Sequence, residues 1–174
     1  EGVLGEGRGI VSHFGLQGRV TFEGGSFSKA LGVQGGILAG SEDVRTHALN
    51  HSRSWLLSGS QPPGVAAAQK AAIEVLMSEP EHVQRLWDNT SYFKEQLDSM
   101  GFDTGVSETP IVPVMCGDSR KAQELSSLMR DEGVMVGAIV FPMVARDKAR
   151  VRTQMSAGLS RGELDTVLEL FDRC

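Results

Sequence analysis

Several features are scarce in this sequence, and each scarcity excludes a class of protein. Only two cysteines occur, Cys116 and Cys174, which are too few for a disulfide framework or a zinc site, and we expect no metal. Lysine and arginine number 17 against 22 aspartates and glutamates, and no basic run occurs, so nucleic-acid binding is not expected. No apolar run reaches the roughly 18 residues of a membrane-spanning helix.

The N-terminal residues are unusual in a different way. The opening EGVLGEGRGI lacks a charged segment followed by an apolar one, so it does not resemble a signal peptide. Many of the 21 glycines lie in residues 1–40, between short apolar strands predicted at 19–22 and 36–39. Glycine-rich turns between strands indicate either backbone that closely approaches a ligand or a loop-rich sheet edge.

Two helices are predicted in the middle of the chain. Residues 65–77 are rich in alanine, which favours a helix. Residues 81–100 form the second helix, with Pro80 at its start and Gly101 directly after its end. Apolar residues at spacings of three and four give this second helix one buried stripe. The stripe consists of Val83, Leu86, Trp87, Phe93, Leu97 and Met100.

The last third of the chain predicts a small α+β unit in the order strand, helix, strand, strand, helix. Residues 111–115 form a strand whose proline indicates an edge or strand-start position. Asp118 is a candidate N-cap for a helix that runs to Met129. Strands follow at 134–141 and at 149–157, where apolar residues alternate with polar ones.

Ser160 and Glu163 have the spacing of a capping box and predict a final helix.

Chemistry is predicted at Lys29, which lies among small residues in GGSFSKALG, directly after a strand. A lysine whose pKa is lowered by burial or neighbours can form a Schiff base with a carbonyl compound. The hydroxyls of Ser26 and Ser28, with glycine N–H groups, are suited to holding a phosphate. The segment is not a P-loop, since it does not match G-x-x-x-x-G-K-[ST]. Without further motifs, the alternative is a solvated surface lysine.

Four segments occur in an order that resembles one family. GVLGEGRG, GSFSKALG, SRSWLLSGS and ARVRTQMSA are similar to motifs of the α-oxoamine synthases, a branch of the fold-type-I pyridoxal phosphate enzymes. The resemblance covers essentially the whole chain. It implies an α/β fold, the C-terminal part of a fold-type-I transferase, with the end of the large-domain sheet at 1–79 and a small α+β domain at 80–174.

The resemblance also implies roles for individual residues. Lys29 matches the lysine that binds the cofactor, pyridoxal 5'-phosphate, and Ser26 matches a residue that contacts its phosphate. Ser58 falls in a phosphate-contacting segment that the family brings from the partner subunit. Arg152 is similar to the arginine that binds the amino-acid carboxylate, a task suited to a bidentate guanidinium. Arg150, on the same strand face, is expected to be a supporting charge.

The activity implied is the condensation of an amino acid with an acyl-CoA to give an α-amino ketone. The segments RTQMSA and IVPVMCGD look most like 2-amino-3-ketobutyrate CoA ligase (glycine C-acetyltransferase), which implies glycine and acetyl-CoA as substrates. The alternatives are an 8-amino-7-oxononanoate synthase-type or other α-oxoamine synthase activity, another fold-type-I enzyme such as an aminotransferase, and a non-catalytic dimerisation module.

The family's Asp-x-Ala-His segment, whose aspartate pairs with the cofactor's pyridine nitrogen, would lie just before Glu1. We therefore expect the C-terminal portion of a longer polypeptide, with little activity by itself. The resemblance further implies a homodimer with a shared active site, and a cytoplasmic setting consistent with free thiols.

Overall fold

The fold was analysed in a computed structural model that describes residues 2–173. The chain divides into two compact units, Glu1–Val83 and Gln84–Cys174, called unit 1 and unit 2 below. The predicted domain boundary after residue 79 lies near this division and stays a prediction. None of the described helices is long and apolar enough to cross a membrane.

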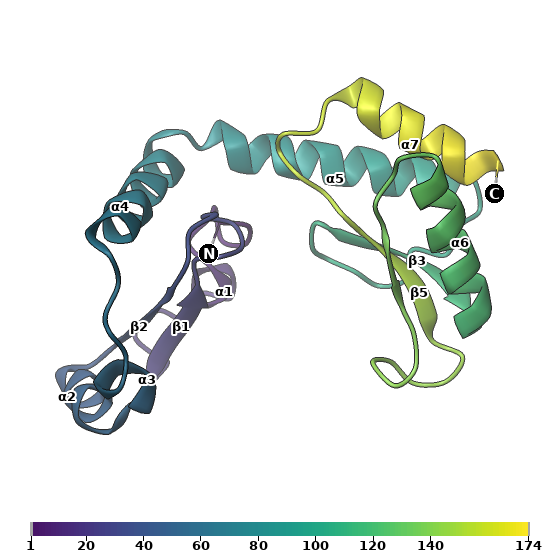
Figure 1. Cartoon of the computed structure of the whole chain (residues 1–174). Helices are drawn as coiled ribbons and strands as arrows, with labels where there is room; N and C mark the ends of the chain where they lie inside the picture. Colours follow the sequence, from purple (N-terminus) through teal and green to yellow (C-terminus); the bar gives the residue numbers. More distant parts are fainter. Residues whose placement is uncertain (1, 174) are drawn as a thin grey trace. The chain divides into compact units, whose positions relative to one another are not determined.

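Unit 1 is built around an antiparallel hairpin (Figure 1). Its elements are α1 (Ile10–His13), β1 (Phe22–Ser26), β2 (Gly36–Gly40), α2 (Glu42–His51), α3 (Arg53–Leu56) and α4 (Pro63–Ser78). The strand predicted at 19–22 is wrong, because only Phe22 of that range is in β1 and the strand continues through the glycine pair. A Cβ on Gly36 would lie 2.6 Å from the carbonyl oxygen of Gly25, so glycine permits this pairing.

Little apolar surface is buried within unit 1. Among its described residues, Val11 and Phe27 are the only buried apolar side chains, and every residue of β2 is exposed. The hairpin and the helices are therefore held mainly by local hydrogen bonds.

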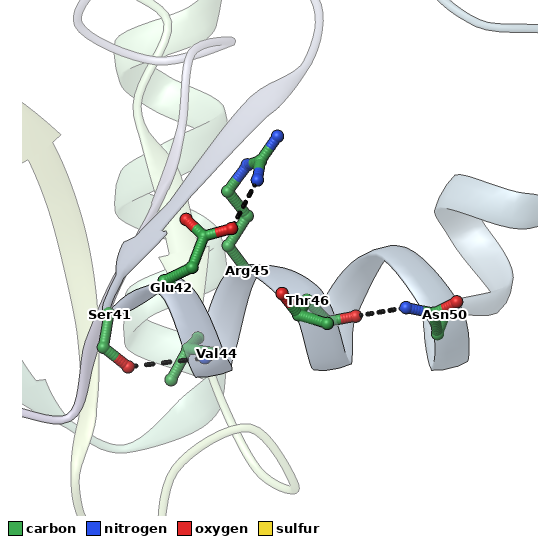
Figure 2. A network of polar contacts seen from close by, with 6 residues as sticks. All are labelled: Ser41, Glu42, Val44, Arg45, Thr46 and Asn50. Carbon is green, nitrogen blue, oxygen red and sulfur yellow. Dashed lines mark hydrogen bonds and ion pairs between the residues drawn. The ribbon is translucent and has the colours of Figure 1, made fainter.

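Helix α2 illustrates this local bonding, as Figure 2 shows. Ser41 is the N-cap and accepts a hydrogen bond from the backbone N–H of Val44 at 3.4 Å. Arg45 forms an ion pair with Glu42 at 2.7 Å, and Asn50 donates to the carbonyl of Thr46 at 2.7 Å. No residue of α2 is buried, which explains why no apolar periodicity announces this helix.

Both helices predicted in the middle of the chain are confirmed. The first is α4, which begins at a proline, and the second is α5 (Glu81–Ser99). The buried face of α5 includes Phe93 and Leu97 of the predicted stripe, whereas Met100 is exposed because it lies beyond the helix end. Gly101 follows α5 with a φ of 88°, the left-handed conformation expected after a helix end.

Unit 2 confirms the predicted order of strand, helix, strand, strand, helix. Its elements after α5 are β3 (Ile111–Gly117), α6 (Ser119–Asp131), β4 (Gly137–Ile139), β5 (Ala149–Gln154) and α7 (Arg161–Arg173). The strands form an antiparallel sheet in the order β3-β5-β4, so β3 is an edge strand as its proline predicts. Strand β4 is shorter than the predicted range 134–141.

The predicted helix starts in unit 2 are also confirmed. Asp118 caps α6 by accepting from the backbone N–H groups of Arg120 and Lys121 at 2.9 and 3.1 Å. Ser160 and Glu163 form a reciprocal capping box: the N–H of Ser160 donates to Oε2 of Glu163, and the N–H of Glu163 donates to the Ser160 hydroxyl. The bonds that the N–H and the hydroxyl of Ser160 donate to the Glu163 carboxylate lower the pKa of Glu163.

The hydrophobic core lies on one face of the unit 2 sheet. Helices α5, α6 and α7 supply side chains to this face, and α6 contacts all three strands (Figure 1). The core cluster is Phe93, Leu97, Val112, Val114, Met129, Val151, Leu164, Leu168, Leu170 and Phe171. Because side chains alternate along a strand, the even-numbered residues of β5 point to the opposite face.

Candidate functional site

The hairpin of unit 1 presents Lys29 at an exposed turn. Strand β1 ends at Ser26, and the chain returns to β2 through a loop anchored by Phe27, whose side chain is buried. The N–H of Phe27 donates to the carbonyl of Gly35 at 2.9 Å, and the N–H of Val33 donates to the carbonyl of Phe27 at 3.0 Å. These bonds close the base of the loop, so Lys29 projects from a defined position and its side chain is exposed.

Two hydroxyls lie together beside this lysine. The Oγ atoms of Ser26 and Ser28 are 2.8 Å apart and both residues are exposed. A primary amine next to paired hydroxyl donors is a set of groups that suits an aldehyde with a phosphate ester, so these residues fit pyridoxal phosphate. The structure brings the two hydroxyls together, and their role in holding a phosphate beside Lys29 stays a prediction.

Other parts of unit 1 approach the same loop. A Cβ on Gly2 would lie 2.4 Å from Cβ of Ala30, and one on Gly35 would lie 2.1 Å from Nε2 of Gln61. Gln69 of α4 donates from Nε2 to the carbonyl of Gln34 at 2.7 Å. Glycine therefore serves here for close packing against the chain itself. No local pattern in the sequence announces Gln61 or Gln69, because both are distant in sequence from the loop: Gln61 lies just before α4 and Gln69 lies within it.

Ser58 lies two residues beyond α3, in the segment that leads to α4, and is exposed. The next residues include Ser60, which has a φ of 70° although it is not glycine. Nearby apolar side chains are also exposed, with Leu57 at 82% and Trp55 at 64%. Contact of Ser58 with a phosphate across a subunit interface stays a prediction.

In unit 2, Arg150 and Arg152 lie on the face of β5 opposite the core. They line an open hollow of about 750 Å³ whose other walls include Ile111, Pro113, Met115, Ile139, Lys148 and Asp103. The central position of β5 puts residues of both neighbouring strands beside each arginine: Pro113 and Gly137 beside Arg152, and Met115 and Ile139 beside Arg150. The alternation predicted for this strand is confirmed, with Val151 and Thr153 buried on the other face.

The hollow carries excess positive charge. Within residues 2–173, neither Arg150 nor Arg152 forms an ion pair with a carboxylate. Arg150 donates from Nε to the carbonyl of Lys148 at 3.0 Å, which fixes its side chain without neutralising it. The carboxylate of Asp103 accepts from the N–H of Gly105 at 2.8 Å. The arrangement is suited to an anion. Lys148 and Asp103 also line the hollow, and no motif in the sequence singles them out.

The segment after β5 is held by a buried side chain that the sequence did not single out. Asn89 of α5 donates from Nδ2 to the carbonyls of Ser156 and Leu159 at 3.0 and 2.9 Å, with only 6% of the residue exposed. These bonds fix the turn between β5 and α7. Asn89 therefore supports the strand that carries Arg152. Its polar character within a largely apolar stripe is the only signal for it in the sequence.

The candidate residues thus belong to two groups. Lys29, Ser26 and Ser58 belong to unit 1, and Arg152 belongs to unit 2. No cluster of three or more potential metal ligands occurs among the described residues.

Comparisons with known proteins agree on one family. A family model described as aminotransferase class I and II matches residues 1–171. The 8-amino-7-oxononanoate synthase of Symbiobacterium thermophilum is 53% identical over 171 residues, and 8-amino-7-oxononanoate synthase 1 of Bacillus subtilis is 48% identical over 173 residues. The alignments cover 98% and 99% of this chain and 44% of each relative, so the chain spans less than half their length.

Solved structures of similar fold include enzymes that use pyridoxal phosphate, and one of them bears the same name as the sequence relatives. A serine palmitoyltransferase variant from S. paucimobilis, with PLP and myriocin bound, is 28% identical and superposes with a TM-score of 0.91 over 99% of this chain and 44% of that chain. The 8-amino-7-oxononanoate synthase of Francisella tularensis gives a TM-score of 0.83 over 99% of this chain and 51% of that chain; at 19% identity this shows the fold alone.

The superpositions confirm the predicted α/β fold of a fold-type-I pyridoxal phosphate-dependent transferase. The cofactor expected from the resemblance is the one held by the serine palmitoyltransferase structures. The family model extends across both units, from the hairpin that presents Lys29 to the strand that presents Arg152 and on to α7. The chain belongs to the aminotransferase class I and II family.

Proposed function

We propose that this chain carries the lysine and the carboxylate-binding arginine of a pyridoxal phosphate-dependent acyltransferase of the α-oxoamine synthase type. The observation that carries the proposal is the hairpin loop of unit 1, where Lys29 is exposed and the hydroxyls of Ser26 and Ser28 lie 2.8 Å apart. Family membership supports it, because the curated relatives bear the name of such a synthase.

Each residue has a defined task in this proposal. The primary amine of Lys29 would hold the aldehyde group of the cofactor, with Ser26 on its phosphate and Ser58 contributing to the phosphate site of a partner subunit. When bound, pyridoxal phosphate supplies an electron sink for negative charge at the amino acid's Cα. Once released, the Lys29 amine takes the proton from Cα as a general base, and Arg152 fixes the carboxylate of the amino acid.

The bonds made and broken follow from the product type. A new carbon–carbon bond joins the amino acid's Cα to the carbonyl carbon of an acyl thioester, the C–S bond breaks, and the thiol leaves. The amino acid's carboxylate then leaves as carbon dioxide, and Cα takes up a proton in its place. Lys29 and Arg152 hold the reacting groups while the thioester approaches, and this positioning supplies much of the rate advantage.

The name of the relatives narrows the substrates. In 8-amino-7-oxononanoate, the amine-bearing carbon and the terminal methyl correspond to alanine without its carboxylate. The remaining carbons correspond to a linear heptanedioyl group, with the ketone at the former thioester carbon and a free carboxylate at the far end. The relatives therefore support alanine and a heptanedioyl thioester better than glycine and acetyl-CoA, the pair indicated by the motif RTQMSA.

The test uses the protein that carries this chain. It is mixed with pyridoxal phosphate, reduced with borohydride, digested and analysed by mass spectrometry for a pyridoxyl group on Lys29. Lys29→Ala should abolish specific labelling, whereas Lys70→Ala, which removes an exposed lysine of the same unit, should not. Labelling spread equally over several lysines would contradict the proposal.

Substrate choice is measured on the same preparation with alanine or glycine and with heptanedioyl-CoA or acetyl-CoA. Product mass and released thiol identify the reaction. We expect the pair of alanine and heptanedioyl-CoA to react fastest. Transamination without thiol release would instead identify an aminotransferase.

A further inference from the structure

A few polar side chains are buried in unit 2, although its core cluster is apolar. Among residues 2–173 the buried polar residues are Asn89, Thr90, Thr104, Ser126 and Thr153. Burying a hydroxyl costs free energy unless it finds a hydrogen-bond partner, and an apolar side chain of similar shape would fill the same space without that cost. The partners of these groups therefore indicate what the buried hydroxyls contribute.

The hydroxyl of Thr153 lies one position from Arg152 on the core side of β5. Thr153 is only 4% exposed, and its Oγ1 donates to the carbonyl of Val112 in β3 at 2.6 Å. Val112 lies opposite Thr153, and the next residue of β3, Pro113, lies opposite Arg152. The threonine thus adds a side-chain bond between the two strands directly beside the pair that contains Arg152.

The backbone of Arg152 itself receives no support from β3. The N–H of Met155 donates to the carbonyl of Pro110 at 2.9 Å, and bonded and non-bonded pairs alternate along antiparallel strands. The pair of Pro113 and Arg152 is therefore a non-bonded pair, in which the missing N–H of proline costs the ladder nothing. The N–H and C=O of Arg152 face β4 instead, where Gly137 lies opposite.

A second buried hydroxyl holds β4 at this same position. Ser126 of α6 is 3% exposed, and its Oγ donates to the carbonyl of Val136 at 2.7 Å. Val136 directly precedes Gly137, the first residue of β4 and the partner of Arg152. Strand β4 has only three residues and begins with a flexible glycine, so a bond from the core at its start limits its movement.

We propose that Thr153 and Ser126 are positioning residues for Arg152. They lie on the core side of the sheet and Arg152 lies on the outer side, so they act through the backbone of β3, β5 and β4 and not by touching a substrate. This inference rests on the proposed function and deepens it. A guanidinium that binds a carboxylate through two parallel bonds tolerates little displacement, so the placement of this strand sets the affinity for the amino acid.

The test compares Thr153→Val with Thr90→Val in the complete protein that carries this chain, loaded with pyridoxal phosphate. Each substitution removes one buried hydroxyl and keeps the shape of the side chain. Thr90 is the matched control, because it is also 4% exposed and donates at 2.7 Å to the carbonyl of Leu86 within its own helix, α5.

The expected result is a change in one kinetic constant. Thr153→Val should raise the KM for alanine about tenfold, while kcat and the KM for heptanedioyl-CoA stay within about twofold of the unchanged protein. Ser126→Ala should raise the KM for alanine by a smaller factor. Thr90→Val should leave all three constants unchanged.

Thr153→Ser separates positioning from stability. It keeps the hydroxyl but removes a buried methyl group, so it should lower the unfolding midpoint and yet retain the alanine KM of the unchanged protein. A purely structural role would instead make the KM for alanine follow the unfolding midpoint across the variants, and that result would overturn the inference.

Other results would also count against the inference. An equal alanine KM in Thr153→Val and Thr90→Val would overturn it, as would an equal rise in the KM for both substrates. The unchanged protein is measured alongside, so a failure of the proposed function is recognised separately. Absence of turnover in the unchanged protein would refute the proposed function, and this inference with it.

Discussion

Replacing Asn89 with alanine tests whether one buried amide holds the segment behind the Arg152 strand. Asn89 lies on α5, and its Nδ2 donates to the carbonyls of Ser156 and Leu159 in the turn between β5 and α7. Alanine keeps the helix but removes both donors, and it leaves the two carbonyls without their protein partner.

The expected loss follows from these contacts. A hydrogen bond contributes roughly 0.5–1.5 kcal/mol net, so two bonds from one buried side chain give about 2 kcal/mol. Ser156 is exposed, so water can reach its carbonyl, and the cost of leaving that group unpaired is small. We therefore expect unit 2 to lose about 2 kcal/mol of unfolding free energy, and the turn after β5 to become mobile.

The assay is urea unfolding followed by the fluorescence of one tryptophan. Trp87 is in unit 2 and Trp55 is in unit 1, so a Trp55→Phe background isolates unit 2. Asn50→Ala is the control, because Asn50 also donates to a backbone carbonyl but is exposed on α2 (Figure 2). The reasoning is refuted if Asn89→Ala and Asn50→Ala shift the unit 2 midpoint equally.

Two more predictions concern other contacts. Tyr92 is the only tyrosine, and its hydroxyl donates to Asp165 at 2.5 Å, which raises its pKa above 10.0. The stability that this bond contributes is present below pH 10.0 and is lost as the pH rises through the raised pKa of Tyr92. Asp165→Asn should lower the pKa of Tyr92, as measured by ultraviolet titration. An unchanged titration curve would contradict the assignment of the raised pKa to Asp165. Gly35→Ala puts a Cβ at a φ of 112°, which lies farther from the left-handed region than the 63° of Gly32, while the amide ends of Gln61 and Gln69 that it meets can move aside. It should therefore destabilise unit 1 by roughly 1 kcal/mol more than Gly32→Ala, which meets open space. Urea unfolding followed by Trp55 in a Trp87→Phe background measures the difference, and equal midpoints would count against it.

The sequence predicts unit 2 well because its elements bury apolar faces with regular spacing. The stripe on α5 and the alternation on β5 both point to side chains that are buried in the core. Asp118 and the pair of Ser160 and Glu163 are local signals, since each cap depends on residues within a few positions. Local chemistry of this kind can be read without knowing the fold.

Unit 1 is harder to predict for the corresponding reason. Helices α1, α2 and α3 are short or exposed, and α2 buries none of its residues, so no apolar period marks them. The hairpin places its glycine pair inside β1, where glycine would ordinarily weaken a strand. Lys29 could be identified only from the order of four motifs. The contact from Gln69 to the loop spans 35 positions and has no local signature.

The two units divide the tasks of this chain in physical terms. Unit 2 holds a continuous core and presents its arginines on the outer face of a sheet, where hydrogen-bonded neighbours fix their spacing. Unit 1 presents Lys29 from a loop held by polar contacts, with Phe27 as its buried anchor. A ligand that binds such a loop adds stability by mass action, about 2.7 kcal/mol at a concentration 100 times its Kd. Occupancy of the Lys29 site should therefore raise the unfolding midpoint of unit 1. The unfolding midpoint of unit 2, which depends on its own core, should not change.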